Sequence, residues 1–132
     1  ELDWTDGFVV LLQTTSPLRI AADIDACIQS CVDADAPSAV TVSAVSKPPQ
    51  WMFRLDSACK MERLIEDDSA YRRQDTEPVY ALNGAVYVAR TDWYRRHRNF
   101  IDDQTVARIM PAERSVDIDT EMDLTLARAL VA

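Results

Sequence analysis

The chain has 132 residues, a formal net charge of −8 and a hydrophobic share of 48%. That share suffices for one ordinary globular core. The acidic surface disfavours nucleic-acid binding, and no apolar run is long enough to span a membrane. Three cysteines without a C-x-x-C spacing favour reduced thiols and a cytoplasmic location. Cys27 and Cys31, four residues apart, suit two small core positions better than a metal pair.

The beginning of the chain predicts a strand, a helix and a second strand. An apolar run at 8–12 is typical of a buried strand in a parallel sheet. Apolar residues recur at helical spacing over 20–34, with Asp23 among the residues left for solvent. Valines alternate with polar residues over 39–45, which indicates a strand. Together these elements predict a parallel βαβ crossover.

Residues 47–80 show no clean period and contain two adjacent prolines followed by a charged stretch. We interpret them as a protruding excursion, with a short ribbon and a short helix, that faces a partner subunit. No linker divides the chain, so 1–132 is expected to be a single domain with this excursion at about 47–80.

The remaining sequence returns to regular patterns. Strands are predicted over 85–89 and 105–110, with Thr91 between them as the cap of a short helix. Thr120 and Asp123 match a capping box at the start of the last helix. The buried stripe of that helix is predicted at Met122, Leu126, Ala129 and Leu130.

Two carboxylates in the segment from Ser115 to Asp119 are the sharpest local feature. In an extended segment, residues two apart point the same way, so Asp117 and Asp119 share one side. Such a pair suits Mg²⁺, which takes one or two carboxylates and substrate phosphates. The alternative is that Asp119 is solvated near a helix N-terminus, where the helix dipole favours it.

Polar residues follow the first predicted strand. Ligands of open α/β sheets bind at the carboxyl ends of strands. Gln13 has a donor and an acceptor that suit sugar hydroxyls, and Arg19 has a planar fork that suits an anion. A polar turn without a ligand explains the pattern equally well.

Further polar groups lie in and after the excursion. Arg72 and Arg73 suit a carboxylate or a phosphate, although a charged surface loop is the simpler interpretation. Asn83-Gly84 before an apolar run indicates a tight turn with positive φ. The basic cluster at 95–98 is interpreted as the solvated face of a helix. No serine or cysteine nucleophile stands out, and no catalytic residue is assigned.

Four blocks, taken together and in this order, resemble the acylneuraminate cytidylyltransferases. The resemblance covers essentially the whole chain. The blocks are Leu11-Leu12-Gln13-x-Thr15-Ser16-Pro17-Leu18-Arg19, Pro48-Pro49-x-Trp51-Met52-Phe53-Arg54-Leu55-Asp56, Arg72-Arg73-Gln74-Asp75 with Asn83-Gly84-Ala85-x-Tyr87, and Met110-Pro111-x-Glu113-Arg114-Ser115-x-Asp117-Ile118-Asp119-Thr120-Glu121-x-Asp123.

The resemblance implies a Rossmann-like α/β nucleotidyltransferase fold, with a three-layer and mostly parallel sheet. It also implies transfer of CMP from CTP to an acidic nine-carbon sugar, with release of pyrophosphate and help from Mg²⁺. By motif match, Asp117 and Asp119 hold the metal, Gln13 contacts the sugar and Arg73 pairs with the sugar carboxylate. Asn83 and Tyr87 line the same pocket. Family members commonly dimerise, which implies a homodimer or higher homo-oligomer here.

One departure from the family concerns the nucleotide. The family's first strand and its Gly-, Lys- and Arg-containing loop for CTP have no counterpart, and two glycines cannot rebuild such a loop. We therefore expect a domain truncated at its N-terminus that is inactive by itself. Two interpretations stay open: a piece of a working enzyme, or an inactive homologue acting as a binding or oligomerisation module. The sugar acid is also open among sialic, legionaminic and pseudaminic acids.

Overall fold

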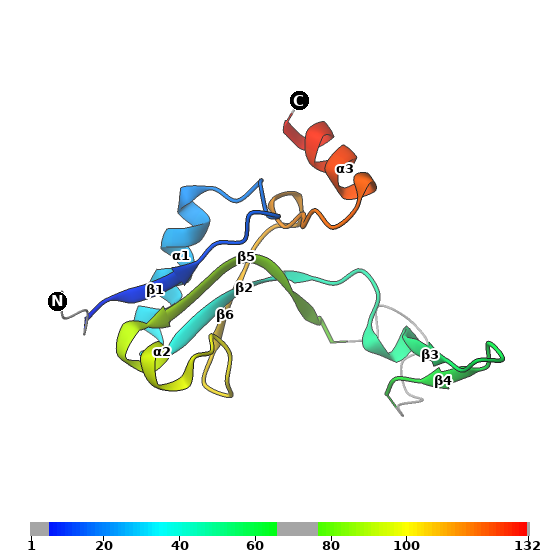
Figure 1. The fold of residues 1–132 in the computed structure, drawn as a ribbon, viewed down its shortest axis with the longest axis horizontal. Coiled ribbons are helices and arrows are strands. Elements are labelled where there is room, and N and C mark those ends of the chain that lie inside the picture. The colour runs from blue at the N-terminus through cyan, green and yellow to red at the C-terminus, as the bar shows by residue number, and fades with distance from the viewer. Residues whose placement is uncertain (1–5, 66–76, 132) are drawn as a thin grey trace. The chain divides into compact units, whose positions relative to one another are not determined.

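The computed structural model describes residues 6–65 and 77–131, which form a mixed α/β fold (Figure 1). The chain divides into two compact units. One consists of Glu1–Ser43 and Leu82–Ala132, and the other of Ala44–Ala81. The first unit carries a four-stranded sheet, and the second carries a two-stranded ribbon.

The sheet contains β1 (Phe8–Leu11), β5 (Tyr80–Arg90), β2 (Ser38–Ala44) and β6 (Val106–Ile109), side by side in that order. β1 pairs antiparallel with β5, and β2 pairs parallel with β6. β5 also runs antiparallel to β2, because Arg90 N donates to Pro37 O while Val86 N donates to Thr41 Oγ1.

The expectation of a mostly parallel sheet is therefore wrong. The strands at 8–12 and 39–45 do run parallel to each other, but β5 lies between them and opposes both. β1 is an edge strand with partly exposed residues, not a buried central one. Local periodicity locates strands, whereas the neighbour of a strand is decided by residues far away in the chain.

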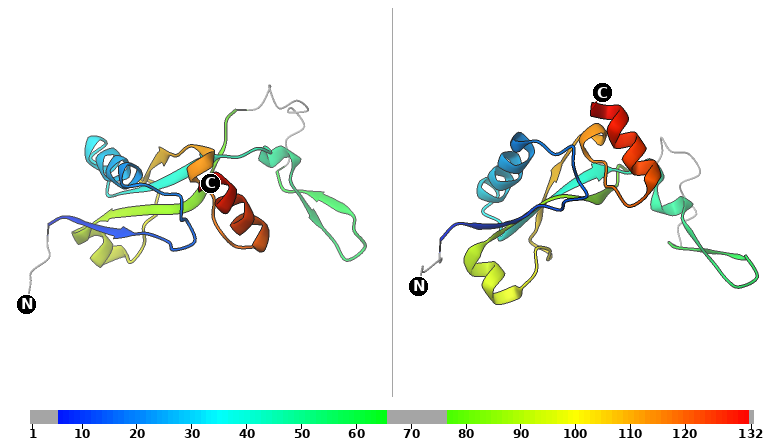
Figure 2. Two further views of the ribbon diagram at one scale, coloured as in Figure 1. Left: turned by 90° about the horizontal axis from the view of Figure 1, so that it is seen from above. Right: turned by 45° about the horizontal axis from the view of Figure 1, so that its top comes forward.

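The helices α1 (Ala21–Asp33) and α2 (Thr91–His97) lie on opposite sides of the sheet (Figures 1 and 2). α2 begins at Thr91 itself after Arg90, so Thr91 is the first helical residue and not the predicted cap. The main core lies between α1 and the sheet. Its fully buried apolar members are Cys27, Cys31, Ala39, Ala85, Val86, Val88 and Met110.

The two helical cysteines are core residues, as the sequence predicts. Both are fully buried, and the Cys31 thiol donates a hydrogen bond to Ala36 O at 3.1 Å. Burial, and then the neighbouring Cys31, raise the pKa of the Cys27 thiol to about 12. Burial also raises the pKa of Cys31.

These environments predict selective thiol chemistry. In the native protein at pH 8, Ellman's reagent is expected to react rapidly with the exposed Cys59 and not with Cys27 or Cys31. Adding denaturant should release the two buried thiols. Rapid native modification of Cys27, identified by mass spectrometry, would contradict the burial described here.

The last helix, α3 (Glu121–Val131), begins as predicted. Asp123 Oδ2 accepts from Thr120 N at 2.8 Å and from Thr120 Oγ1 at 2.7 Å, and Asp123 N donates back to Thr120 Oγ1 at 3.3 Å. These bonds lower the pKa of Asp123. The predicted buried stripe is wrong, because Met122 is 77% exposed and Leu126 is 51% exposed, while Ala127 is buried.

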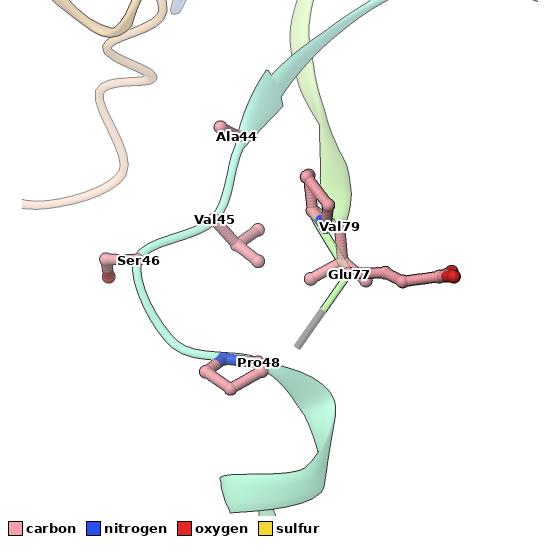
Figure 3. Close-up of a pocket in the computed structure, with 7 residues that line it drawn as sticks. Ala44, Val45, Ser46, Pro48, Glu77 and Val79 are labelled. Carbon is pink, nitrogen blue, oxygen red and sulfur yellow. The ribbon is translucent and has the colours of Figure 1, made fainter. Parts of the chain in front are cut away.

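The second unit contains a short 3₁₀ helix at Pro49–Trp51 and a ribbon of β3 (Phe53–Leu55) and β4 (Met61–Arg63). The ribbon strands pair antiparallel, and all their side chains are exposed. A mostly apolar hollow of about 230 Å³ lies beside the chain segments that enter and leave this unit. Val45 projects toward Val79 there, and the Glu77 carboxylate points away from Val45 (Figure 3).

None of the helices in the described part of the chain combines the length and the hydropathy that crossing a bilayer requires.

Candidate functional site

The side chains of Gln13 and Asp117 meet at Gly84, in the middle of β5. A Cβ atom at Gly84 would collide with Gln13 Oε1 and would lie 3.3 Å from Asp117 Oδ2. Gly84 has the positive φ that the sequence predicts, +73°, although it lies within a strand and not in the predicted tight turn. The missing side chain at Gly84 is therefore what allows both oxygens to lie close to the β5 backbone at this position.

A Gly84→Ala substitution is expected to cost about 1–2 kcal/mol, because an L-residue at this φ is strained. It should also displace the Gln13 side chain from Asp117, because that side chain is flexible and yields first. Gly7→Ala is the matched control: Gly7 also has positive φ, +110°, but nothing lies within 4 Å of its Cβ position. Chemical denaturation measures the cost. In the Gly84→Ala background, Gln13→Ala should relieve the collision, and no relief would contradict this contact.

Asp117 carries an unsatisfied atom. Its Oδ1 is buried and has no hydrogen-bond partner among the described residues. Buried carboxylate oxygens are nearly always paired, because leaving one unpaired costs about 1–3 kcal/mol. The Asp117 carboxylate, with Oδ1 orphaned and Oδ2 facing the same Gly84 position as the Gln13 amide oxygen, is therefore a group that a cation would stabilise.

The segment that carries Asp117 is anchored to the loop that carries Gln13. Ile118 N donates to Thr15 O at 2.8 Å, and Ser16 Oγ donates to Asn83 O at 3.4 Å. A 3₁₀ turn at Ala112–Arg114 precedes the segment. Three distant parts of the sequence, at 13–16, 83–84 and 115–118, thus converge around Gly84 of β5.

Asn83 is a buried connector in this arrangement. Its Oδ1 accepts from Thr41 Oγ1 at 2.7 Å and from Ala85 N at 3.1 Å. Its Nδ2 donates to Ser115 Oγ at 3.0 Å and to Met110 Sδ at 3.4 Å. Protein groups therefore satisfy the whole amide. This geometry assigns Asn83 to holding β2, β5 and the Asp117 segment together, whereas its contact with a ligand stays a prediction.

Tyr87 lies two residues beyond Ala85 on β5, opposite Leu11 of β1. Burial raises the pKa of its hydroxyl first, and the negative charge of Asp117 raises it further. The phenol consequently stays protonated at neutral pH and remains a hydrogen-bond donor on the Asp117 side. The Tyr87 ring packs against Phe100, with ring centroids 5.9 Å apart, and its place in the pocket with Gln13 stays a prediction.

The other predicted site residues have different positions. Asp119 is exposed, and its backbone N donates to Asp123 Oδ2 at 3.2 Å. Asp119 is therefore close to the capped start of α3, as its alternative interpretation states. Arg73 lies outside the described residues, together with the rest of the segment at 66–76.

The chemistry of these groups fits Mg²⁺ better than a transition metal. The donors are carboxylate and amide oxygens, which hard cations prefer. Within 6–65 and 77–131, no cluster of three or more His, Cys, Asp or Glu residues is suited to a metal. Mg²⁺ does not need such a cage, because it keeps several waters and uses one or two carboxylates with substrate phosphates.

The buried ion pair of Asp23 with Arg114, which the sequence did not indicate, connects α1 to the turn that precedes Asp117. Asp23 is 5% exposed, not solvated as expected. Both its oxygens accept from Arg114, at 2.9 Å from Nη2 and 3.0 Å from Nε. Asp23 Oδ2 also accepts from Ile20 N at 3.1 Å, which closes the start of α1. Arg114 lies in the fourth resemblance block, three residues before Asp117, and membership of that block is the feature of the sequence that could have pointed to it.

Comparison with known proteins points the same way. No protein-family model matches the chain. It is 35% identical over 114 residues to an N-acylneuraminate cytidylyltransferase of Streptococcus agalactiae serotype V, covering 86% of this chain. It is 30% identical over 126 residues to a CMP-N,N'-diacetyllegionaminic acid synthase of Legionella pneumophila, covering 93% of this chain. An N-acylneuraminate cytidylyltransferase of Escherichia coli is 32% identical over 125 residues.

The matches cover only a part of each relative. The chain spans 28% of the length of the Streptococcus agalactiae enzyme and 53% of the Legionella pneumophila enzyme. The resemblance carried by the four sequence blocks is nevertheless confirmed, and the chain is a homologue of one part of the acylneuraminate cytidylyltransferases.

Proposed function

We propose that this chain provides the sugar-binding and magnesium-binding side of a cytidylyltransferase site. The reaction is transfer of CMP from CTP to an acidic nonulosonic sugar of the sialic acid type. A sugar hydroxyl oxygen bonds to the α-phosphorus, pyrophosphate leaves with the electrons of the broken P–O bond, and the hydroxyl proton passes to solvent. The observation that carries this proposal is the meeting of Gln13 and Asp117 at Gly84, with Asp117 Oδ1 unpartnered.

The roles proposed for Asp117, Gln13, Tyr87 and Asn83 draw on their positions, and those of Asp119 and Arg73 draw on the motif match alone. Asp117, together with Asp119, holds Mg²⁺, which when bound offsets the negative charge of the phosphates. Gln13 orients the sugar through its amide, and the Tyr87 hydroxyl, on β5, donates a hydrogen bond to the sugar. Asn83 ties β5 to β2 and to the segment that carries Asp117. Arg73 is proposed as the partner of the sugar carboxylate.

The complete fold and assembly are also proposals. The four-stranded sheet would form part of a larger Rossmann-like nucleotidyltransferase sheet, in a cytoplasmic homodimer or higher homo-oligomer. Exposed apolar side chains favour association: Leu55 and Met61 on the ribbon are each 63% exposed. Sedimentation velocity is expected to show self-association, and a monodisperse monomer would contradict it.

The competing interpretation is an inactive homologue that acts as a binding or oligomerisation module. It is favoured by the exposed apolar residues of the ribbon. The two interpretations differ at the site around Gly84. Only the enzymatic one requires this site to bind Mg²⁺ and an acidic sugar.

Two experiments test the proposal. Isothermal titration of the chain with sialic acid, with and without Mg²⁺, is expected to show binding that Gln13→Ala removes. Replacing the matching 114 residues of the Streptococcus agalactiae enzyme with this chain should yield a chimera that releases pyrophosphate from CTP. The chain by itself is expected to show no turnover. Absence of sugar and Mg²⁺ binding in the folded chain would favour the inactive module.

A further inference from the structure

Arg19 bridges two backbone carbonyls beside the candidate site. Its Nη1 donates to Ala85 O at 2.6 Å and to Gln13 O at 3.1 Å. Gln13 carries the proposed sugar contact, and Ala85 follows Gly84, where Gln13 and Asp117 meet. One guanidinium nitrogen therefore connects the backbone at Gln13 to the backbone of β5 next to Gly84.

The register of the sheet explains why a bridge is needed there. β1 and β5 pair from Phe8↔Arg90 to Leu11↔Tyr87. If this register continued, Gln13 would lie opposite Ala85. The strand β1 ends at Leu11 instead, and both carbonyls accept from Arg19. The guanidinium thus takes the place of the next rung of the ladder and keeps the diverging chain attached to β5.

This arrangement is energetically significant and specific for arginine. Hydrogen bonds from a charged donor to a carbonyl are stronger than neutral ones. A planar guanidinium nitrogen presents two N–H groups in fixed directions, whereas a lysine ammonium is a compact charge on a flexible stem. Arg19 Nη1 has both its hydrogens engaged by these two carbonyls.

We propose that Arg19 is a positioning residue, which sets the location of Gln13 by fixing its backbone to β5 in place of a ladder rung. This inference rests on the proposed function in one respect: the Gln13 amide that Arg19 positions is the one proposed to contact the sugar. Nη1 is engaged by the two carbonyls, so the anion expected at Arg19 would contact the remaining guanidinium nitrogens. An anion-binding role is the competing outcome of the test below.

The test uses amide nitrogen chemical shifts in the full chain. The peptide nitrogens of Thr14 and Val86 are bonded to the carbonyl carbons of Gln13 and Ala85, so their shifts report hydrogen bonding at those carbonyls. Arg19→Ala is expected to move both signals and the Gln13 side-chain amide. Arg19→Lys should restore the two backbone shifts only in part, since an ammonium on a flexible stem does not hold its N–H groups in the fixed directions of a guanidinium nitrogen. Arg95→Ala, an exposed arginine on α2, is the control and should move none.

Chemical rescue separates positioning from general stability. Arg19 itself lines a hollow of about 420 Å³, together with Ile20 and Leu130 among others, so removing its side chain enlarges a space that is open to solutes. Guanidinium ion at non-denaturing millimolar concentration is therefore expected to return the Thr14 and Val86 signals of Arg19→Ala toward those of the unmodified chain. Potassium ion should not. If Arg19→Ala does not fold, Arg19→Lys, compared at both signals, decides the question.

The outcomes distinguish this inference from the proposed function. Unchanged Thr14 and Val86 shifts in Arg19→Ala or in Arg19→Lys would overturn the positioning role, whatever the chain binds. If phosphate or sialic acid alone changes the chemical shifts of Arg19 in the unmodified chain, an anion site at Arg19 is supported instead. Failure of sugar and Mg²⁺ binding in the unmodified chain would overturn the proposed function and leave the carbonyl bridge intact.

Discussion

Replacing Asp117 with asparagine is expected to weaken Mg²⁺ binding about 100-fold or more, because it removes the carboxylate charge on which the ion depends. The same change should leave the metal-free chain as stable as before, or more stable. Asp117 Oδ1 is buried without a hydrogen-bond partner among the described residues, so the unmodified chain bears about 1–3 kcal/mol for an unpaired polar group. Binding residues often show this opposition between stability and function.

Thermal unfolding at increasing Mg²⁺ concentration measures both effects at once. The unmodified chain should gain stability with the logarithm of Mg²⁺ above its dissociation constant, and the Asp117→Asn variant should not. Asp25→Asn is the matched control, because Asp25 is exposed on α1 and remote from the site in sequence. An Asp117→Asn variant that retains Mg²⁺ stabilisation would remove Asp117 from the metal site.

The sequence located most elements because helical and strand periods are local. The predicted helix at 20–34 and the strands at 39–45 and 105–110 correspond to α1, β2 and β6 within one residue or two. The sheet order was not accessible in the same way. β5 enters between β1 and β2 from 35 residues or more further along the chain, and no local pattern at 8–12 records which strand will pair with it.

The last helix shows a different limit of periodicity. Apolar spacing correctly groups Met122, Leu126 and Leu130 on one helix face, but it does not say whether that face is covered. In the described chain these residues are exposed, while Ile118, Leu124 and Ala127 line a hollow on the inner side. Whether other elements cover a helix face depends on the tertiary arrangement, so residue spacing alone could not predict it.

The candidate site was partly predictable for a chemical reason. Motif residues such as Gln13 and Asp117 carry the chemistry, so the resemblance blocks indicated them directly. The residues that hold them were not indicated, because their partners are 42 positions away for Thr41 and Asn83 and 91 positions away for Asp23 and Arg114. The sequence indicated the positive φ of Gly84 but not the space that this glycine leaves for the Gln13 and Asp117 side chains.

Removing the buried partner of Arg114 is expected to produce the largest loss of stability. The Asp23 side chain is 6% exposed and accepts from Arg114 and from Ile20 N. Asp23→Ala should lower the free energy of unfolding by about 2–3 kcal/mol, because it leaves charged and backbone donors without their acceptor. The control is Asp92→Ala on α2, whose exposed pair with Arg96 should contribute about 0.5 kcal/mol or less. Urea denaturation at pH 7 measures both.

The same ion pair gives stability a defined pH dependence. The hydrogen bonds from Arg114 lower the pKa of Asp23 below its ordinary 3.8, so the unfolded chain binds the proton more readily than the folded one. The contribution of Asp23 is therefore complete above the unfolded pKa and is lost as the pH falls through the folded pKa. Asp23→Asn should flatten this acid slope in denaturation series between about pH 5 and pH 2, and Asp92→Asn should not. An unchanged slope in Asp23→Asn would show that the pair does not drive acid unfolding and that other carboxylates do.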